Sequence, residues 1–448
     1  METIAAISTP NAPGGIAMIR ISGPDAVQIA AKVFRPANGQ DITRMHGYTC
    51  AYGSISDGET LLDDAVLTVF RAPHSFTGED TAEITCHGGI YVTKRILQLV
   101  FAAGAMPAGA GEFTKRAFLN GKLSLTQAEA VMDVIRAEGE FALRQATLAR
   151  DGRLGKEMRA LTDRLVGTLA ALSYWMDDAE ECPPELDPDT LQRNLSQIRE
   201  QMFSLSAHYQ NGRILREGIR TVLLGLPNAG KSSVMNWLCG SERSIVTEIP
   251  GTTRDVVREY VKIDDFTLIL SDTAGIRETG NQIEAIGISQ AKREAEQADL
   301  IFYVVDASVG LSDYDRELLE QLSDRAVAVL WNKTDLPAVP APELPFPVIQ
   351  CAAPSERSTE KIFAALNRLF SEIRFAGVPS VLNERQNQLI LRAISYIDRA
   401  ADGLKQGIPL DLLYTDLELA AKQLQEIEGE HIADETVEAV FSQFCVGK

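Results

Sequence analysis

The glycine-rich segment Gly225–Ser232 constrains the fold of this chain more than any other feature of its sequence. It matches the phosphate-binding pattern G-x-x-x-x-G-K-[ST] at every fixed position. The apolar run Ile219–Leu224 before it predicts a buried strand, and Ser232–Cys239 after it has helical character. A strand, a glycine turn and a helix start aim backbone N–H groups at phosphate oxygens. The segment therefore predicts a phosphate-binding loop in a doubly wound, Ras-like α/β domain.

The side chains of this loop have predicted roles in holding a nucleotide. Lys231 would reach the β- and γ-phosphates, and Ser232 would bind Mg²⁺. The loop residues expected to contact the nucleotide are Asn228, Ala229, Gly230, Lys231, Ser232 and Ser233.

A second motif, Asn332–Asp335, indicates which base is bound. It follows the apolar run Ala326–Trp331, which predicts a strand. The Asp335 carboxylate could accept hydrogen bonds from both N1–H and the 2-amino group of guanine, and adenine offers no such pair of donors. A buried acceptor left unpaired by the wrong base discriminates strongly. With Asn332 and Lys333 as further contacts, the motif predicts GTP.

The motif Asp272, Thr273, Ala274 and Gly275 also belongs to the predicted nucleotide site. Asp272 is placed to act on Mg²⁺ through water, and the small Gly275 lets its backbone N–H approach the γ-phosphate. The next residue is Ile276, where Ras-type GTPases carry a glutamine that orients the attacking water. Isoleucine has no donor or acceptor, so hydrolysis is slow or another group positions the water.

Other residues could supply what Ile276 lacks. Glu284 is the nearest attractive carboxylate downstream, although its spacing alone favours a solvated helix residue. Asn228 could help to ligate a monovalent cation. The Gly/Pro-rich stretch around Thr252–Asp255 suits a switch loop that the γ-phosphate orders, with Thr253 as the second hydroxyl on Mg²⁺.

Composition and charge limit the class of protein. The chain has no apolar run near the ~18 residues that span a bilayer. Its N-terminus lacks the features of a signal peptide, and its six cysteines show no C-x-x-C spacing, so a reducing cytoplasm is expected. The net charge of −19 argues against a generally basic nucleic-acid surface, but it allows a local patch or an RNA held by a partner.

The 448 residues are long enough for about three domains, of mixed α/β and α class. Residues 1–118 indicate an α+β domain. Its predicted elements are the strands Ile16–Ile21, Ala65–Phe70 and Ala82–Cys86 and the helix Lys94–Ala102.

Residues 119–215 and 378–448 are helical, apart from the acidic loop Asp177–Asp189. An apolar stripe predicts a packing core in the second stretch, at Leu413, Leu417, Ala420, Ala421, Leu424 and Ile427. Residues 216–377 would form the GTPase domain, inserted into one helical domain because close termini make insertion easy. Two unrelated helical units are the alternative.

Several segments outside the nucleotide motifs carry a resemblance to a known family. The chain resembles the MnmE (TrmE) family of GTPases, which act in tRNA wobble-uridine modification, over essentially its whole length. The segments that carry the resemblance are Gly14–Gly23, Ser75–Asp80, His87–Gly89, Gly111–Lys122 and Phe441–Lys448.

The resemblance implies a fold and an activity. It implies an N-terminal folate-binding and dimerising domain, a helical domain and an inserted GTPase. It also implies a partner, MnmG (GidA), which carries FAD and joins a heterotetramer that acts on tRNA. The complex would install a carboxymethylaminomethyl or aminomethyl group at C5 of the wobble uridine. The carbon would come from 5-formyl- or methylene-tetrahydrofolate, and the nitrogen from glycine or ammonia.

The resemblance also assigns residues to the GTPase cycle. Asn228 matches a K⁺ ligand, supported by backbone groups of Thr247, Ile249 and Thr252. Potassium and nucleotide would bring two GTPase domains together. Glu284 matches the carboxylate that orients water through a bridge, which reverses the expectation from its spacing.

For the tetrahydrofolate derivative, the matching residues are Arg20, Glu83, Lys122 and Lys448. Without the family, Arg20 and Lys122 would be taken as surface cations, and Lys448 as part of a disordered end. Cys445 is a candidate catalytic nucleophile, although a small buried apolar residue or a frayed tail is the simpler interpretation.

Three positions depart from the family pattern. Leu226 replaces an arginine seen in some relatives, and Pro250 stiffens the switch loop. Cys351–Ala353 stands where a Ser-Ala-Lys turn usually contacts the base, so backbone N–H groups would have to serve.

Two other functions remain open from the sequence. One is a GTP-dependent switch in ribosome assembly, which shares the GTPase core but would be expected to carry a basic RNA-binding module. The other is a one-carbon transferase whose GTPase is only regulatory.

Overall fold

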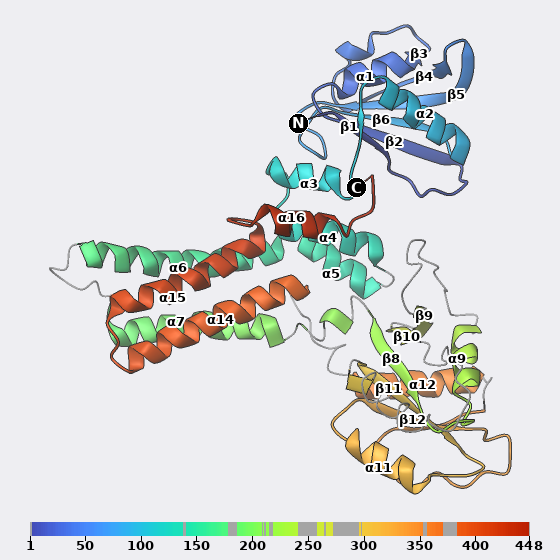
Figure 1. Ribbon diagram of the computed structural model, residues 1–448, viewed down its shortest axis with the longest axis vertical. Helices are drawn as coiled ribbons and strands as arrows, with labels where there is room; N and C mark the ends of the chain where they lie inside the picture. Colours follow the sequence, from blue (N-terminus) through green and yellow to red (C-terminus); the bar gives the residue numbers. More distant parts are fainter. Residues whose placement is uncertain are drawn as a thin grey trace. The chain divides into compact units, whose positions relative to one another are not determined.

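The computed structural model forms two compact units. The first consists of Met1–Ile135, Ala149–Arg199 and Arg392–Lys448, and the second of Arg136–Leu148 and Glu200–Leu391. Figure 1 shows the order of the elements along the chain. The structure describes residues 2–137, 140–177, 186–207, 209, 212–214, 218–240, 258–263, 266–271, 295–296, 298–352, 356–370 and 383–447.

The N-terminal part of the first unit is built on a seven-stranded sheet in the order β3-β4-β5-β6-β2-β1-β7. All neighbours are antiparallel except β1 and β7, which are parallel. The strands are β1 Ile4–Ile7, β2 Ile16–Ser22, β3 Phe34–Pro36, β4 Thr49–Asp57, β5 Thr60–Phe70, β6 Thr81–His87 and β7 Met106–Pro107. The helices are α1 Ala26–Val33, α2 Ile90–Ala102 and α3 Glu112–Leu119, with a 3₁₀ turn at Ile42–Arg44.

One face of this sheet is covered by α1 and α2, and the other is covered only in part, where Phe113 of α3 packs with Ile4 and Ala6 of β1. Alternate residues such as Ile19 and Ile21 of β2 pack with Val27 of α1 and Ile96 of α2 in one apolar cluster. The opposite face carries side chains that remain open, including Ile16 of β2, which is 68% exposed. The period-two alternation explains why β2 and β6 were predicted closely from their sequences.

Two elements of this domain are longer than predicted. β5 begins at Thr60 rather than Ala65, because its first five residues, Thr60–Asp64, do not alternate apolar with polar residues. α2 begins at Ile90 rather than Lys94, directly after Gly89, whose extended backbone forms the N-cap.

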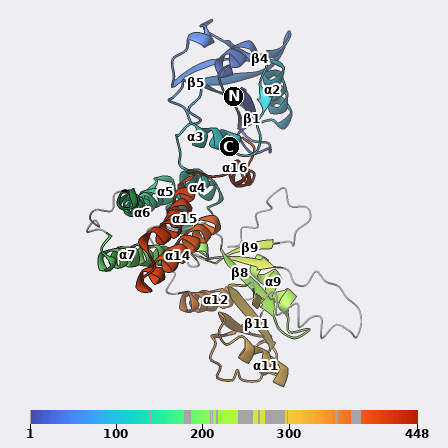
Figure 2. The same ribbon diagram turned by 60° about the vertical axis from the view of Figure 1, so that its left-hand side comes forward.

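The helical segments confirm the predicted helical composition. They are α4 Leu125–Arg136, α5 Glu140–Arg150, α6 Arg153–Asp177, α7 Pro188–Ala207, α14 Glu384–Lys405, α15 Leu410–Glu428 and α16 Asp434–Phe441. All six residues of the predicted stripe on α15 are buried, and α15 lies alongside α6 in both ribbon views (Figure 2). Of the predicted acidic loop Asp177–Asp189, residues 178–185 lie outside the described residues.

The end of the chain is tied to the N-terminal domain within the first unit. Phe441 and Phe444 pack with Phe118 of α3 and Leu125 of α4 in one apolar cluster. Figure 1 shows α16 beside α3, and the two helices are in contact. The helical part and the N-terminal sheet therefore share a junction made of α3, α4 and α16.

The second unit contains a six-stranded sheet in the order β13-β12-β11-β8-β10-β9. Its neighbours are parallel except β9, which is antiparallel to β10. The strands are β8 Ile219–Leu224, β9 Arg258–Ile263, β10 Phe266–Ser271, β11 Leu300–Asp306, β12 Val327–Asn332 and β13 Val348–Gln350. The helices are α9 Lys231–Gly240, α11 Asp313–Gln321 and α12 Glu356–Leu369.

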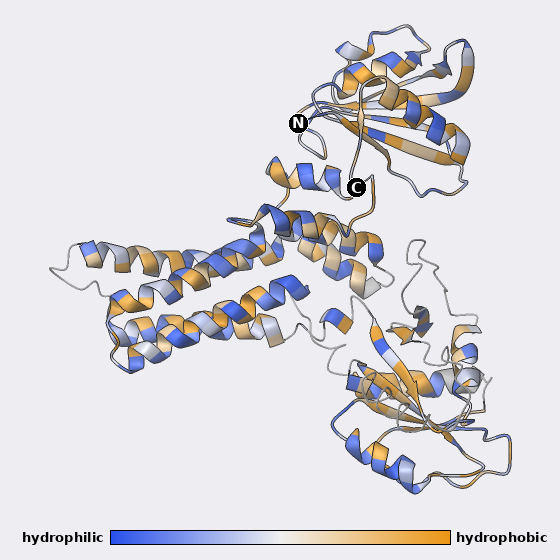
Figure 3. Cartoon of the chain, in the orientation of Figure 1, coloured by the Kyte–Doolittle hydropathy of each residue, from blue (hydrophilic) through white to orange (hydrophobic). Residues whose placement is uncertain are grey.

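Apolar clusters cover both faces of this sheet. One contains Trp237 of α9 and Leu366 of α12, and the other contains Leu318 and Leu319 of α11. A parallel sheet buried on both faces has nearly continuous apolar strands, as the colouring of β8, β11 and β12 shows (Figure 3). The predicted doubly wound α/β fold is confirmed, and β8 has the predicted bounds.

No helix among the described residues combines the length and apolar character needed to cross a bilayer.

Candidate functional site

The phosphate-binding loop joins β8 to α9 and depends on two of its glycines. Gly225 has a φ of +140° and Gly230 has a φ of +98°, which side chains rarely adopt. A Cβ on Gly225 would lie 2.2 Å from the Val304 carbonyl oxygen. A Cβ on Gly230 would lie 2.3 Å from Asn332 Nδ2. The loop therefore needs glycine at both ends for backbone geometry and for space.

Lys231 lies at the first position of α9 with its ammonium group folded over the loop. Its Nζ donates hydrogen bonds to the carbonyl oxygens of Gly225 at 2.8 Å and Leu226 at 2.9 Å. Burial lowers the pKa of Lys231. Ser232 and Ser233 follow as exposed residues, and the first turn of α9 contains no acidic side chain. The helix start thus presents cationic and N–H groups without an opposing carboxylate, which suits an anionic ligand.

The two motifs that are far apart in sequence are joined by side-chain hydrogen bonds. Asn332, at the end of β12, is 2% exposed and donates from Nδ2 to the Ala229 carbonyl at 3.0 Å. Lys333 Nζ donates to the Asn228 carbonyl at 2.8 Å. Asn228 and Lys333 both have a φ of +64°. The end of β12, which carries the Asn332–Asp335 motif, therefore holds the phosphate loop in its conformation.

Asp306 was not among the residues predicted from sequence, yet it belongs to this network. It ends β11, and its Oδ2 accepts from Lys333 Nζ at 2.6 Å. Its Oδ1 accepts from the Ser308 N–H at 2.9 Å and the Ser308 hydroxyl at 2.6 Å. Burial acts to raise the pKa of Asp306, but the hydrogen bonds from Lys333 and Ser308 outweigh it and hold the pKa below its ordinary value.

Asp335 does not match the expectation of a buried acceptor. It is exposed, two residues beyond Lys333. Its carboxylate would become buried only when a base binds over it. Discrimination against the wrong base therefore depends on this burial in the complex.

The turn after β13 supports Asn332 from the other side. Cys351 is 1% exposed, and its Sγ lies 3.8 Å from Asn332 Oδ1. Burial raises the pKa of the Cys351 thiol to about 11, so it stays protonated and can act as a weak donor. The Thr334 N–H donates to the Cys351 carbonyl at 3.3 Å. Cysteine in place of the usual serine thus still contacts the base motif.

The remaining predicted residues of the nucleotide site fall outside the described residues. They are Thr247, Ile249, Thr252, Thr253, Asp272, Thr273, Ala274, Gly275 and Glu284, together with Pro250 and Ile276.

A second candidate site lies on the partly covered face of the N-terminal sheet. Arg20 of β2 and Glu83 of β6 are register partners, and Arg20 Nε donates to Glu83 Oε1 at 2.8 Å. The guanidinium carbon lies 5.5 Å from the ring centre of Phe76 and 5.6 Å from that of Phe113. The Arg20 side chain is 13% exposed, so the interpretation of Arg20 as a surface cation is wrong.

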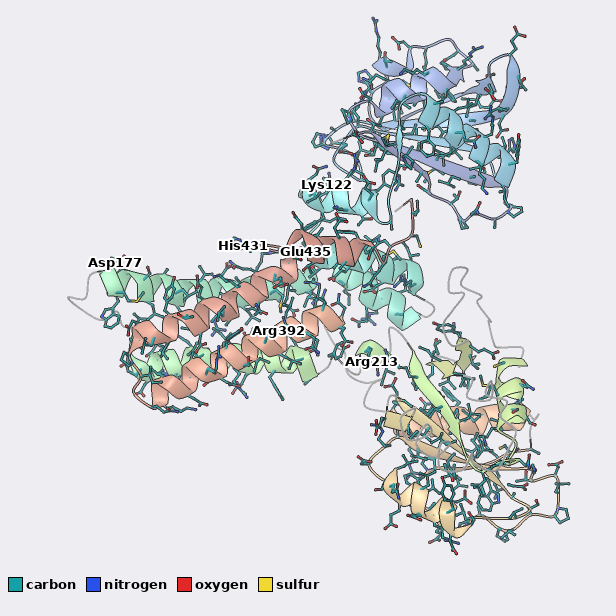
Figure 4. The ribbon with its side chains drawn as sticks, viewed as in Figure 1. Lys122, Asp177, Arg213, Arg392, His431 and Glu435 are labelled. Carbon is teal, nitrogen blue, oxygen red and sulfur yellow. The ribbon has the colours of Figure 1, made fainter. Side chains whose placement is uncertain are left out.

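Lys122 fits the expectation of a surface cation. It lies past the end of α3 and is labelled in Figure 4. It is exposed, and its Nζ donates to the Pro73 carbonyl at 2.9 Å.

Arg116 is a buried cation that the sequence did not reveal. Its side chain is 6% exposed and donates to Glu112 Oε1 at 2.8 Å, Glu79 Oε2 at 3.2 Å and the Glu2 carbonyl at 2.8 Å. Ser22 Oγ donates to the same Glu79 carboxylate at 2.8 Å. These bonds fix α3 against the loop that carries Phe76.

Cys445 of the C-terminal motif is neither frayed nor buried. Cys445 is exposed, and its carbonyl accepts from the Gly111 N–H at 3.3 Å. Val446 forms an antiparallel bridge with Ala110, and Ser8 Oγ donates to the Gly447 carbonyl at 2.9 Å. Both simple interpretations of Cys445 are therefore wrong, since backbone hydrogen bonds hold an exposed thiol beside the start of α3. Lys448 lies outside the described residues.

Two family models match the chain. The one described as GTP-binding protein TrmE N-terminus matches residues 3–122. The one described as MnmE helical domain matches residues 125–445.

Relatives described as tRNA modification GTPase MnmE match over the full length. The relative from Bacillus velezensis is 40% identical over 459 residues, covering 100% of each chain. Those from Moorella thermoacetica and Streptococcus gordonii are 40% and 41% identical, each covering 100% of this chain and 99% of the relative.

Proposed function

The chain belongs to the family of the TrmE and MnmE proteins, and from this premise we propose that it hydrolyses GTP as a component of tRNA wobble-uridine modification. The observation that carries the proposal is the network in which Asn332 and Lys333 hold the backbone of Ala229 and Asn228. It couples the segment that would read guanine to the segment that would hold phosphates.

The described residues fit a magnesium-bound guanine nucleotide. Gly225 and Gly230 shape the loop, Lys231 brings a cation to it, and Ser232 offers a hydroxyl at the start of α9. Asp335 would accept from the guanine donors. We propose Thr253 and Asp272 as further groups toward Mg²⁺, and Thr273, Ala274 and Gly275 as contacts of the γ-phosphate.

We further propose that hydrolysis depends on potassium and on dimerisation. Asn228 is exposed on the loop, so its side chain can reach a cation at the rim of the site. A potassium ion held there would supply positive charge toward the phosphates. Thr247, Ile249 and Thr252 are the proposed backbone ligands, and Glu284 is the proposed residue that orients water.

The exposed apolar side chains on the partly covered face of the N-terminal sheet support dimerisation. Tyr52 of β4 and Val66 of β5 are register partners and are 60% and 38% exposed. Tyr48 is 69% exposed beside Phe70, and Ile16 is 68% exposed. A patch of this kind indicates an interaction surface, and we propose a second copy of the chain as its partner.

We propose that a tetrahydrofolate derivative binds near Arg20 and Glu83. A cation between two aromatic rings suits an aromatic, anionic ligand, and a carboxylate suits the donors of a pterin. Lys122 and Lys448 are the proposed additional cations, and the exposed Cys445 is the proposed nucleophile. The active one-carbon donor would be 5-formyl- or methylene-tetrahydrofolate.

The remaining parts of the proposal concern partners and organisation. We propose a heterotetramer with MnmG, which would bring FAD, and a cytoplasmic location. The GTPase domain would span residues 216–377, inserted between the helical segments 119–215 and 378–448, after an N-terminal domain of residues 1–118.

Reconstitution tests the proposal as a whole. The purified chain is combined with MnmG, FAD, tetrahydrofolate derivative, GTP and unmodified tRNA, and the wobble base is read by mass spectrometry. The expected result is a mass gain at C5 of the wobble uridine that requires GTP hydrolysis. GTP hydrolysis without any modified base would contradict the role in tRNA modification and favour a ribosome-assembly switch. Modification that proceeds without hydrolysis would indicate a transferase with a regulatory GTPase.

A further inference from the structure

We infer that Asp306 is a positioning residue for the potassium ligand Asn228 and acts on it through Lys333. The inference rests on the proposed potassium site. Asp306 accepts a hydrogen bond from Lys333, which in turn donates to Asn228, so its effect on Asn228 passes through the ammonium group of Lys333.

The carboxylate of Asp306 is held in one orientation. Both the N–H and the hydroxyl of Ser308 donate to Oδ1, which leaves Oδ2 directed to Lys333 Nζ at 2.6 Å. Asp306 and Asn332 are register partners at the ends of β11 and β12, and the Ala307 N–H donates to the Asn332 carbonyl at 2.8 Å. The parallel sheet therefore fixes the distance between the Asp306 carboxylate and the backbone of Lys333.

Lys333 transmits this constraint to the loop. The same Nζ that donates to Asp306 also donates to the Asn228 carbonyl at 2.8 Å. Asn228 has a φ of +64°, a sparsely populated conformation that surrounding contacts must maintain. Because the backbone of Asn228 sets the direction of its side chain, the bond from Lys333 determines where the amide oxygen can meet a cation.

Charge supplies a second reason. An ammonium group 2.8 Å from the Asn228 carbonyl would repel a potassium ion bound by the same residue. The Asp306 carboxylate offsets that repulsion while it keeps Lys333 in place. Loss of the carboxylate would therefore weaken cation binding in two ways, by loosening Asn228 and by leaving a positive charge uncompensated.

The test uses the full chain with Asp306→Asn, which keeps a polar side chain of the same size and removes the charge. Asp299→Asn is the matched control. Asp299 precedes the opposite end of β11, where it pairs with Arg213 and accepts from the Arg220 N–H at 2.9 Å. The Asp299→Asn variant shows how much the thermal stability changes when a carboxylate at the other end of β11 is lost. Asp306→Glu, which keeps the charge, tests rescue.

The principal readout is the thermal unfolding temperature of the protein bound to a non-hydrolysable GTP analogue. It is measured at increasing KCl concentrations, with NaCl reduced in parallel so that the ionic strength stays constant. Affinity for fluorescent GDP is measured in NaCl alone. We expect Asp306→Asn to raise the K⁺ concentration for half-maximal stabilisation about fivefold or more. Affinity for fluorescent GDP in NaCl, a buffer that excludes the ion, reports any general loosening of the phosphate loop, and the change in the K⁺ midpoint should exceed the change in that affinity. Asp299→Asn should leave the K⁺ midpoint unchanged, and Asp306→Glu should restore part of the loss.

Two results would overturn the inference in distinguishable ways. A wild-type protein that responds to K⁺, with an Asp306→Asn variant that keeps the same K⁺ midpoint, overturns the role of Asp306 alone. A wild-type protein that responds equally to K⁺ and Na⁺ overturns the potassium site, and this inference falls with it. If Asp306→Asn does not fold, Asp306→Ser, which also removes the carboxylate, takes its place, and an unchanged K⁺ midpoint in that variant has the same meaning as the first result.

Discussion

The nucleotide site of the second unit and the Arg20 site of the first unit use different chemical groups. The phosphate loop uses mainly backbone groups, and the side chains of Asn332, Lys333 and Lys231 serve to hold that backbone. The Arg20 site uses side-chain charges on neighbouring strands, and Arg20 is already paired with Glu83. A site made of backbone fails when its conformation is changed, whereas a site made of charges fails when one partner is removed.

The largest expected effect is that of Gly230→Ala on the backbone-built site. The substitution forces a side chain into a φ of +98° and places its Cβ against Asn332 Nδ2. Backbone strain alone costs about 1–3 kcal/mol, and displacement of Asn332 also breaks its bond to Ala229. We expect the unfolding free energy of the second unit to fall by about 3 kcal/mol and GTP affinity to fall tenfold or more, as about 1.4 kcal/mol of binding energy would do.

Calorimetric GTP titration and thermal unfolding check this prediction. Gly240→Ala is the control, because Gly240 ends α9 and nothing lies within 4 Å of its Cβ position. Equal effects of the two substitutions would show that the loop conformation does not depend on glycine at position 230.

A smaller effect is expected for Arg20→Ala in the charge-built site. Removing the guanidinium leaves the Glu83 carboxylate, which is 18% exposed, without its ion-pair partner. Leaving such a group unpaired costs about 2 kcal/mol. The double variant Arg20→Leu with Glu83→Leu should recover much of that loss, because no charge is then left uncompensated.

Denaturant unfolding of wild type, Arg20→Leu, Glu83→Leu and the double variant measures the coupling between the two residues. Arg35→Ala, at an exposed position of β3, serves as the control and should change stability little. If the double variant is as unstable as the sum of the single variants, Arg20 and Glu83 act independently and the description of this site as a charge pair is wrong.

The smallest effects are opposite pH dependences in the two units. In the first, the hydrogen bond and charge of Asp63 raise the pKa of His87 above its ordinary value of 6.5. The stabilising contribution of the pair is complete below pH 6.5 and is lost as the pH rises through the raised pKa. In the second, Asp306 has a lowered pKa, so its contribution is present above its ordinary value of 3.8 and is lost as the pH falls through the lowered pKa.

NMR titration of the His87 ring measures the first shift directly, and Asp63→Asn should return the pKa toward its ordinary value. Acid unfolding followed in wild type and Asp306→Asn measures the second. An unshifted His87, or an acid transition that Asp306→Asn leaves unaltered, would contradict the corresponding contact.

The two sites also differ in how far their residues could be predicted from sequence. The phosphate loop was predicted because its function depends on contiguous residues, and β8 was found because a strand buried on both faces is a continuous apolar run. Asp306 was missed because its role arises only when β11 lies beside β12 and brings it to Lys333. Nothing in the local sequence of Asp306 distinguishes it from a solvated turn residue.

In the first unit, the burial of some residues depends on contacts between segments far apart in the sequence, so it could not be predicted from neighbouring residues. Arg116 was given no role from its sequence, because only the tertiary contacts with Glu79 and Glu2 reveal that it is buried. Cys445 was expected to be buried or frayed, but backbone bonds to the start of α3 hold it exposed. The predicted domain boundaries at residues 215–216 and 377–378 lie outside the described residues.

The central claim is that the Asn332–Asp335 segment at the end of β12 recognises guanine and also holds the phosphate loop in its conformation. Calorimetric titration of wild type and Asp335→Asn with GTP and with XTP tests it most directly. Xanthine carries an acceptor where guanine carries its 2-amino donor, so an asparagine amide can pair with xanthine and a carboxylate cannot. The account predicts that wild type prefers GTP and that Asp335→Asn reverses the preference to XTP. An Asp335→Asn protein that still prefers GTP as strongly as wild type would contradict it.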